Sequence, residues 1–158
     1  MIGGVKVKKL KTIRDDRGWL SVFLRQDESI FTKFGQCYIT MCEKGVVKAW
    51  HLHKNQTDTL VCVYGKALLV LHDLRKDSPT FNQTQEIKLL DPSHDKDSVL
   101  VKIPPMVAHG FTPMDCNETR ILNIPDIPYN YANPDEERIP WNDTSIPYKW
   151  PSSVSRGG

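Results

Sequence analysis

The sequence predicts an all-β fold, because short strand-like segments follow one another along most of the chain. Residues 5–10, 37–42 and, in part, 67–72 alternate between apolar and polar side chains, which is the period of a half-buried strand. Residues 59–64 and 98–103 are short apolar runs rich in β-branched side chains. Turn residues separate these segments at intervals of roughly ten, a spacing typical of a β-sandwich or a β-barrel.

Two local elements can be predicted within this pattern. Gly65 separates two of the strand segments, and we expect a β-hairpin at this glycine. The only helix candidate follows Asp27, because Ile30, Phe31 and Phe34 would lie on one face of two helical turns.

The C-terminal part of the chain has a different character. Prolines recur throughout residues 125–151 and exclude a long regular element there. The same segment is too rich in aromatic residues for a disordered tail: Tyr129, Tyr131, Trp141, Tyr148 and Trp150. We therefore expect a single domain over residues 1–158, with a core at about 5–124 and an ordered, irregular strap at 125–151.

Composition excludes several classes of protein. The chain has 158 residues and a net charge of +2 from 21 basic and 19 acidic residues, so neither a nucleic-acid partner nor a polybasic membrane anchor is expected. No apolar stretch approaches the ~18 residues of a membrane span. The N-terminus lacks the apolar core of a secretion signal, and we expect a cytoplasmic protein. The four cysteines form no CxxC pair, which favours free thiols.

The candidate chemistry is concentrated around three histidines. His51 and His53 are two apart, so they share one face of a strand. Asp58 follows at a short distance, and His109 comes later, behind a proline turn. This outline resembles the two sequence motifs of the cupin superfamily, which lie on paired strands of a small barrel. In a metal-dependent cupin, His51, His53, Asp58 and His109 could bind an ion, which needs three or four converging ligands.

A narrower resemblance rests on motifs that occur in a fixed order along the chain. They are Asp16-Arg17-Gly18, residues 45–51 (GVVKAWH), residues 72–81 (HDLRKDSPTF), Ile103-Pro104, residues 108–111 (AHGF) and Trp141-Asn142-Asp143. Over about residues 15–151 the chain resembles the dTDP-4-dehydrorhamnose 3,5-epimerase family. The resemblance implies a cupin-type jelly-roll barrel, a homodimer, no cofactor or metal, and a nucleotide-sugar substrate. Family members epimerise carbons beside the ketone of a 4-keto-6-deoxy sugar.

The resemblance also implies roles for individual residues. His51 falls on the position of the base, and Lys48 falls on that of an arginine near the enolate. Because these two residues are three apart, a regular strand would face them oppositely, and we expect a bulge at Ala49. Arg17 matches an arginine near the phosphates, and a surface ion pair is its structural alternative.

Gln36, Asp73 and His109 also match site positions of the family. His53, which stands where the epimerases have a glutamine, Tyr129 and Tyr131 are further candidates for substrate binding. Two of these residues have a purely structural alternative. Asp73 could pair with Arg75 at the end of a strand, and His109 could satisfy a backbone carbonyl.

Several departures from the family pattern are clear. Where the family has a glutamate this chain has Val22, and where the family has a lysine it has Thr59. The tyrosine that acts as the acid should fall near Ile124 or Asp126, where neither residue supplies a phenol. Three tyrosines could replace it: Tyr38, Tyr129 and Tyr131. The C-terminal aspartate that orients the histidine has no counterpart, and Asp73 could take over that role.

A second, shorter resemblance widens the choice of reaction. The run 51–54 (HLHK) is similar to the HAHK run of the dTDP-sugar 3,4-ketoisomerases, which use paired histidines to shuttle protons. Four hypotheses follow from the sequence. The favoured one is a metal-free epimerase, and the others are a ketoisomerase, a metal-dependent cupin and a non-catalytic nucleotide-sugar-binding cupin.

Overall fold

The computed structural model describes the backbone of residues 1–158 and the side chains of residues 1–94 and 97–158. The chain forms the strands β1 (Lys6–Lys9), β2 (Thr12–Asp15), β3 (Gly18–Ser21), β4 (Tyr38–Glu43), β5 (Val46–Leu52), β6 (Asp58–Tyr64), β7 (Lys66–Asp73), β8 (Thr84–Leu90), β9 (Val99–Ile103), β10 (Val107–Pro113), β11 (Glu118–Asn123), β12 (Glu137–Arg138) and β13 (Arg156–Gly157). A short 3₁₀ helix, η1 (Pro92–Asp97), lies between β8 and β9.

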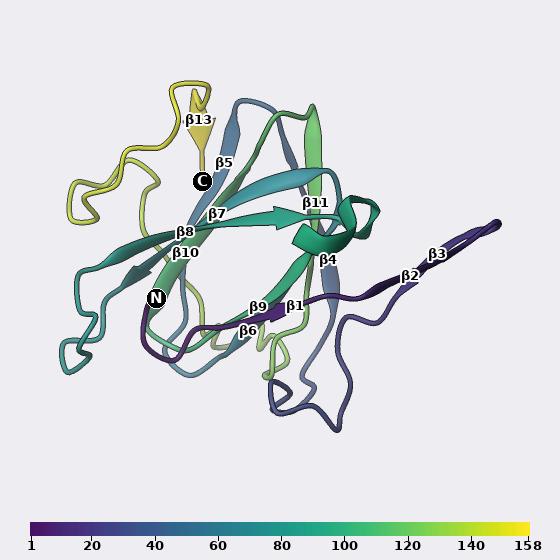
Figure 1. Cartoon of the computed structure of the whole chain (residues 1–158). Helices are drawn as coiled ribbons and strands as arrows, with labels where there is room; N and C mark the ends of the chain where they lie inside the picture. The colour runs from purple at the N-terminus through teal and green to yellow at the C-terminus, as the bar shows by residue number, and fades with distance from the viewer.

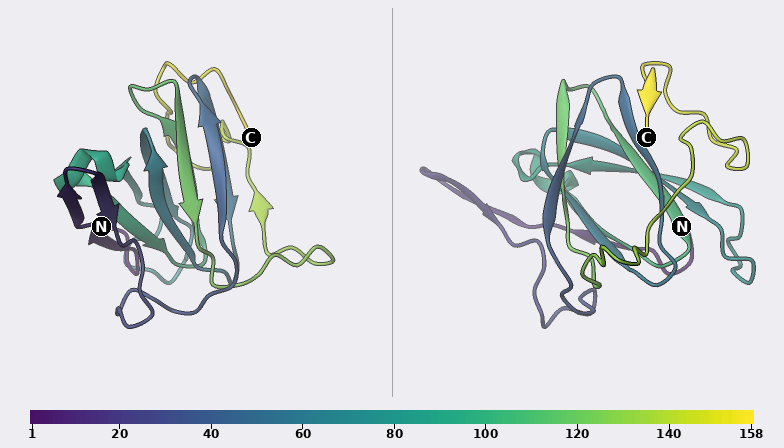
Figure 2. Two further views of the ribbon diagram at one scale, coloured as in Figure 1. Left: turned by 90° about the vertical axis from the view of Figure 1, so that its right-hand side faces the viewer. Right: turned by 180° about the vertical axis from the view of Figure 1, so that it is seen from behind.

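The strands form two main sheets that face each other (Figures 1 and 2). One sheet has the order β1-β9-β6-β11-β4, and the other has the order β12-β5-β10-β7-β8 with β13 added in parallel to β5. The all-β prediction is confirmed. Among the described residues there is no helix long and apolar enough to cross a bilayer.

The main core fills the space between the two sheets. Leu69 and Leu71 of β7 point into it together with Val101 and Ile121 from the facing sheet, and all four are fully buried. Such burial contributes about 1.5–3 kcal/mol for each large aliphatic side chain. Because side chains alternate along a strand, Val70 points the other way, into a second cluster on the outer face.

The C-terminal segment covers that outer face. Trp50 of β5 is 1% exposed, and its ring packs 5.0 Å from Trp150 and 6.0 Å, edge to face, from Tyr148. Ile146 is also buried in this cluster. These contacts explain why the outer face of β5 and β7 is apolar, and they bring the segment before Trp141 close to β5.

The predicted hairpin at Gly65 is wrong. Strand β6 pairs with β9 and β11, whereas β7 pairs with β8 and β10, so the chain changes sheet at Gly65. The glycine has φ 75°, and a Cβ there would lie 2.6 Å from the backbone oxygen of Glu118. A tight corner between two sheets therefore requires glycine for the same local reasons as a hairpin would.

The helix expected after Asp27 is also not formed. The segment contains turns, one of which is closed by a hydrogen bond from the Phe31 amide to the Glu28 carbonyl. Ile30 is buried against Leu10, whereas Phe34 remains exposed. Two isolated helical turns are unstable in water, so tertiary packing decides the path of this segment.

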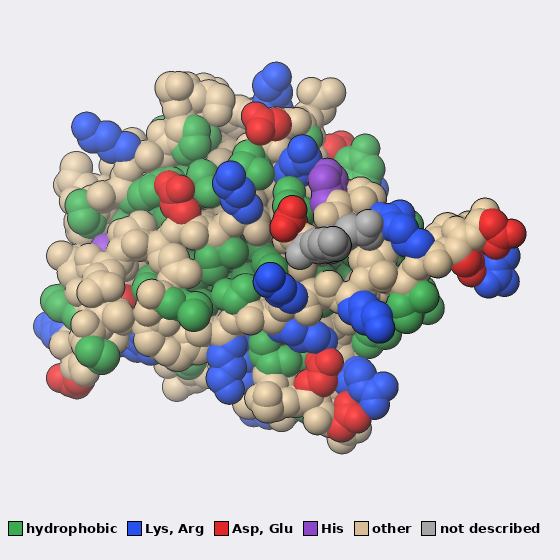
Figure 3. Space-filling model, viewed as in Figure 1, with side chains coloured by type: hydrophobic (Ala, Val, Ile, Leu, Met, Phe, Trp, Pro, Cys, Tyr) green, Lys and Arg blue, Asp and Glu red, His purple; other side chains and the backbone are tan. Residues whose placement is uncertain are grey.

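One hairpin projects away from the two sheets. Strands β2 and β3 pair with each other and with no other strand, and Arg17 lies in the turn between them. The hairpin extends away from the sheets in Figure 1 and in the right-hand view of Figure 2. The space-filling view shows the hairpin as an arm that ends in charged side chains (Figure 3). Ile13, Trp19 and Leu20 on this arm are exposed apolar residues.

All four cysteines are free thiols, as expected, and two of them, Cys42 and Cys62, are buried. Burial raises the pKa of each of these two thiols to about 11, so they are protonated and unreactive at neutral pH.

Candidate active site

A cavity of about 800 Å³ lies between the sheets at the ends of β4, β5, β6 and β10. Its walls contain all but two of the site residues predicted from the sequence: Gln36, Lys48, His51, His53, His109, Tyr129 and Tyr131. Arg17 and Asp73 are the two exceptions. The volume is within the range of small-molecule sites.

The expected bulge in β5 brings Lys48 and His51 to the same cavity. His109 of β10 pairs with His51, but Phe111, two residues further along, pairs with Lys48, so β5 has one extra residue in this interval. This confirms a bulge between Lys48 and His51, the interval that contains Ala49. Gly110 lies opposite, and a Cβ there would approach the Ala49 Cβ to 2.2 Å, which explains why a glycine follows His109.

His51 has a carboxylate partner that the sequence did not identify. Nδ1 of His51 lies 3.0 Å from Oε1 of Glu136, and both side chains are largely buried. A carboxylate only accepts hydrogen bonds, so Nδ1 carries the proton and donates it to Glu136. In the neutral ring Nε2 then has a free lone pair, which is the protonation state that a general base requires.

Electrostatics keep this pair ready for proton transfer. Burial lowers the pKa of His51, and the hydrogen bond to Glu136 opposes that effect. The same hydrogen bond, together with Arg138, lowers the pKa of Glu136 to about 2. The histidine is therefore neutral and the carboxylate charged at neutral pH.

Glu136 reaches β5 because of tertiary structure. It directly precedes β12, which pairs antiparallel with β5 and places Arg138 opposite His51. In the sequence the three consecutive acidic residues 135–137 were the only available signal. They do not show which carboxylate faces which histidine.

Lys48 lies on the same wall of the cavity as His51. Its Nζ donates a hydrogen bond of 2.7 Å to Oγ1 of Thr40 on β4, in the facing sheet. This contact holds a positive charge inside the cavity, where it can stabilise an anion that forms beside His51.

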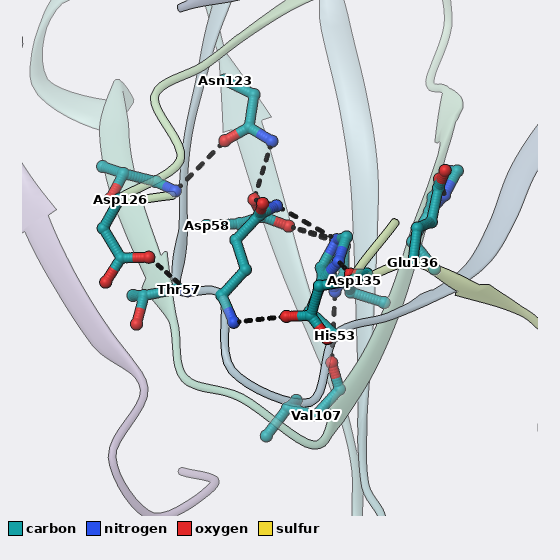
Figure 4. Close-up of polar contacts among 12 residues, drawn as sticks. His53, Thr57, Asp58, Val107, Asn123, Asp126, Asp135 and Glu136 are labelled. Atoms are coloured by element: carbon teal, nitrogen blue, oxygen red, sulfur yellow. Dashed lines mark hydrogen bonds and ion pairs between the residues drawn. The ribbon is translucent and has the colours of Figure 1, made fainter. Parts of the chain in front are cut away.

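A second histidine cluster lies at the base of the cavity (Figure 4). Oδ2 of Asp58 lies 3.1 Å from Nε2 of both His53 and His109, and Oδ1 accepts hydrogen bonds of 2.9 Å from Gln56 and Asn123. The carboxylate is 1% exposed. Burial alone would raise its pKa, but the two histidines hold it well below the usual range.

Backbone carbonyls fix the orientation of these two histidines. Nδ1 of His53 donates to the carbonyl of Asp135, and Nδ1 of His109 donates to that of Val107 at 3.1 Å. A neutral ring would therefore turn a lone pair of Nε2 toward Asp58. Although burial opposes it, the carboxylate raises the pKa of His53 to about 9, so this ring is protonated at neutral pH.

The same donor set fits a divalent cation. The ligand atoms of His53, Asp58 and His109 lie within 4.8 Å of one another. Two ligands at about 2.1 Å from a metal and at right angles are separated by about 3.0 Å, close to the 3.1 Å observed here. Among the described side chains, His51 is not part of this group. A metal ion here would therefore have three protein ligands instead of the four expected from the sequence.

Asp73 does not orient His51, which corrects that expectation. Its carboxylate accepts hydrogen bonds from Arg75, Ser78 and Thr80. It is fully buried at the end of β7 and does not line the cavity. These bonds fix the loop between β7 and β8, so the structural alternative describes Asp73.

Arg17 also lies away from the cavity within its own chain. Its guanidinium forms a 2.5 Å ion pair with Asp15, and its side chain is 84% exposed. At the positions expected for the acid, Ile124 is apolar and the Asp126 carboxylate accepts a 2.8 Å hydrogen bond from the Thr57 amide. Neither position supplies a proton donor.

Comparison with known proteins agrees with this geometry. A model of the family described as dTDP-4-dehydrorhamnose 3,5-epimerase matches residues 1–157. The chain belongs to this family. With the two facing sheets, this confirms the predicted cupin-type jelly-roll architecture.

Individual family members are similar over almost their whole length. The spore coat polysaccharide biosynthesis protein SpsL of Bacillus subtilis is 39% identical over 150 residues, which cover 95% of this chain and 97% of SpsL. The probable low-salt glycan biosynthesis epimerase Agl13 of Haloferax volcanii is 33% identical and covers 97% of both chains. A dTDP sugar isomerase from Desulfovibrio desulfuricans superimposes with a TM-score of 0.86 at 30% identity, covering 94% of this chain and 92% of that one.

Proposed function

We propose that this protein epimerises a nucleotide-activated 4-keto-6-deoxy sugar at a carbon beside the ketone. The observation that carries the proposal is the His51–Glu136 pair, which leaves Nε2 of a buried, neutral imidazole free at the cavity. The names of the relatives support the substrate class, since they include a glycan biosynthesis epimerase and a dTDP sugar isomerase.

The reaction begins with removal of a proton from carbon. Nε2 of His51 takes the proton, and the electron pair of the C–H bond moves into the ketone to form an enolate. The new imidazolium donates to Glu136, whose negative charge stabilises it. The ammonium of Lys48, held by Thr40, stabilises the enolate oxygen. Addition of a proton to the opposite face of the carbon completes the inversion.

The residues that line the cavity suit a substrate with two parts. The sugar occupies the end beside Lys48 and His51, with His53 and His109 at its base. Tyr129 and Tyr131 line the other part, and their rings pack edge to face at 5.0 Å. An aromatic pair of this kind offers a surface on which the nucleotide base can stack. Gln36 accepts a 3.1 Å hydrogen bond from the Tyr129 amide and so positions this loop.

The protein acts as a homodimer in this proposal. The tip of the β2–β3 hairpin projects as an arm (Figure 3), although Thr12 and Arg14 at its base contact η1. The arm exposes Ile13, Trp19 and Leu20. Contact with a second copy would remove these side chains from water. The same contact would bring Arg17 to the partner's cavity, where its guanidinium could bind the phosphates.

Solvent exchange tests the function directly. The protein is incubated in deuterated water with dTDP-4-keto-6-deoxyglucose, and NMR follows both deuterium at the carbons beside the ketone and the epimeric product. We expect both in the wild-type protein and a loss of about 10²-fold or more in His51→Asn. His94→Asn is the matched control, because His94 lies in η1 and outside the cavity.

The remaining hypotheses give different results in the same experiment. A ketone that moves to the neighbouring carbon indicates a ketoisomerase. Binding of the nucleotide sugar without exchange indicates a non-catalytic protein. Exchange that chelators abolish and added metal restores indicates a metal-dependent cupin using His53, Asp58 and His109. Each of these outcomes contradicts the proposed metal-free epimerase.

A further inference from the structure

Inversion at carbon needs a proton donor opposite the base, and the two walls of the cavity come from different sheets. His51 and Lys48 lie on β5 in the sheet of β12, β5, β10, β7 and β8. Tyr38 lies on β4, the edge strand of the other sheet, and also lines the cavity. Its phenol and the His51 imidazole therefore belong to opposing walls.

The hydroxyl of Tyr38 is held by a neighbouring side chain. Asn123 of β11 is the register partner of Tyr38, and its Nδ2 donates at 3.0 Å to the Tyr38 hydroxyl oxygen. The same Nδ2 donates at 2.9 Å to Asp58, and Oδ1 of Asn123 accepts from the Thr59 amide at 3.2 Å. These three contacts determine which way the amide points.

This arrangement leaves the phenolic proton available. The Tyr38 oxygen accepts a hydrogen bond from Asn123, so its own hydrogen points to another acceptor. Burial raises the pKa of Tyr38, and the negative charges of Asp58 and Glu136 raise it further, against the hydrogen bond from Asn123. The phenol is thus protonated at neutral pH, and its hydroxyl lies within the electrostatic influence of the partner of His51.

The other two candidate tyrosines are placed less well. Tyr131 is 90% exposed, and Tyr129 packs its ring against Tyr131. Both lie on the loop after β11 rather than on the sheet that faces His51. No hydrogen bond from a described side chain fixes either hydroxyl.

We propose that Tyr38 is the acid that protonates the enolate on the face opposite His51. This inference rests on the proposed function. The Tyr38 O–H bond breaks, a C–H bond of inverted configuration forms, and the enolate electrons return to the ketone. The resulting tyrosinate takes a proton from water, and the His51 imidazolium releases its proton to water, so the net reaction is an isomerisation.

The variant Tyr38→Phe separates the two half-reactions. It removes only the hydroxyl, and the wall position is retained. Without the acid, His51 still forms the enolate and returns a deuteron from the same face. We therefore expect deuterium in unepimerised substrate at a rate within about 3-fold of the wild-type exchange, while epimeric product falls about 10²–10⁴-fold. Tyr64→Phe is the matched control, because Tyr64 lies outside the cavity, and it should reduce product formation by less than about 3-fold.

The readouts distinguish failure of this inference from failure of the proposed function. If the wild-type protein shows no exchange and no epimeric product, the proposed function fails. If wild-type exchange is present and Tyr38→Phe still epimerises at the wild-type rate, only the role of Tyr38 is overturned. Loss of both exchange and product in Tyr38→Phe, with dTDP binding unchanged by calorimetry, would place Tyr38 in proton abstraction instead and would also contradict the inference.

Discussion

Replacing Glu136 with glutamine tests how much the partner of His51 contributes to catalysis. Glutamine keeps an oxygen that can accept from Nδ1 but loses the negative charge. A hydrogen bond to a charged group is worth about 1.5–3 kcal/mol. The lowering of the Glu136 pKa from 4.5 to about 2 corresponds to about 3 kcal/mol, part of which belongs to Arg138. Because the imidazolium forms only during the reaction, we expect kcat to fall about 10–150-fold.

The pH profile provides an independent check on the same variant. His51 acts as a base when it is neutral, so activity falls as the pH drops through its pKa. Glu136 raises that pKa against the effect of burial. Its removal must therefore move the acidic limb of the profile to lower pH.

The assay is the rate of deuterium incorporation from pH 5 to 9, measured beside the control Glu137→Gln. Glu137 is the adjacent carboxylate, but it pairs with Lys54 rather than with His51. An unchanged rate and an unmoved acidic limb in Glu136→Gln would refute the assignment of this pair. An equal loss in the control would show that charge in the loop, and not the contact with His51, is responsible.

Three further predictions follow from the buried polar groups. Asp58→Asn should lower the free energy of unfolding in urea by about 3–5 kcal/mol, since it leaves the buried, protonated His53 without its counter-charge. In the wild-type protein, the stability that protonated His53 contributes is fully present below its ordinary pKa of 6.5 and is lost as the pH rises through about 9. If the free energy of unfolding changes with pH in the same way in Asp58→Asn, this prediction is contradicted. Asp73→Ala should destabilise the fold by about 2–4 kcal/mol and leave the exchange rate of folded protein unchanged, whereas a selective loss of exchange would return Asp73 to the site. Elemental analysis of protein purified without chelators at pH 7 should find well below one equivalent of divalent metal, because the proton on the His53 imidazole competes with it; a stoichiometric ion lost in His53→Ala would show that the cluster is a metal site.

The sequence by itself determined the strands, the histidine pair and the family. Alternation of side chains is a local property, so strands such as β1 and β4 could be predicted without knowing their partners. The bulge near Ala49 could also be predicted locally. Lys48 and His51 are three residues apart and would face opposite sides of a regular strand, so they can share a cavity only if the strand departs from regular geometry.

Tertiary structure decided which groups meet. Glu136 is 85 residues from His51 in the chain, and only the pairing of β12 with β5 brings them together. The turn at Gly65 and the segment around Ile30 show the same limit. A glycine fits both a hairpin and a corner between two sheets, and a short apolar cluster fits both a helix and a series of turns. The sequence left Asp73 open between the site and a pair with Arg75, because a carboxylate looks alike in a catalytic pair and in a loop anchor. Local patterns depend on backbone period and side-chain polarity, whereas these pairings depend on the register between strands distant in sequence.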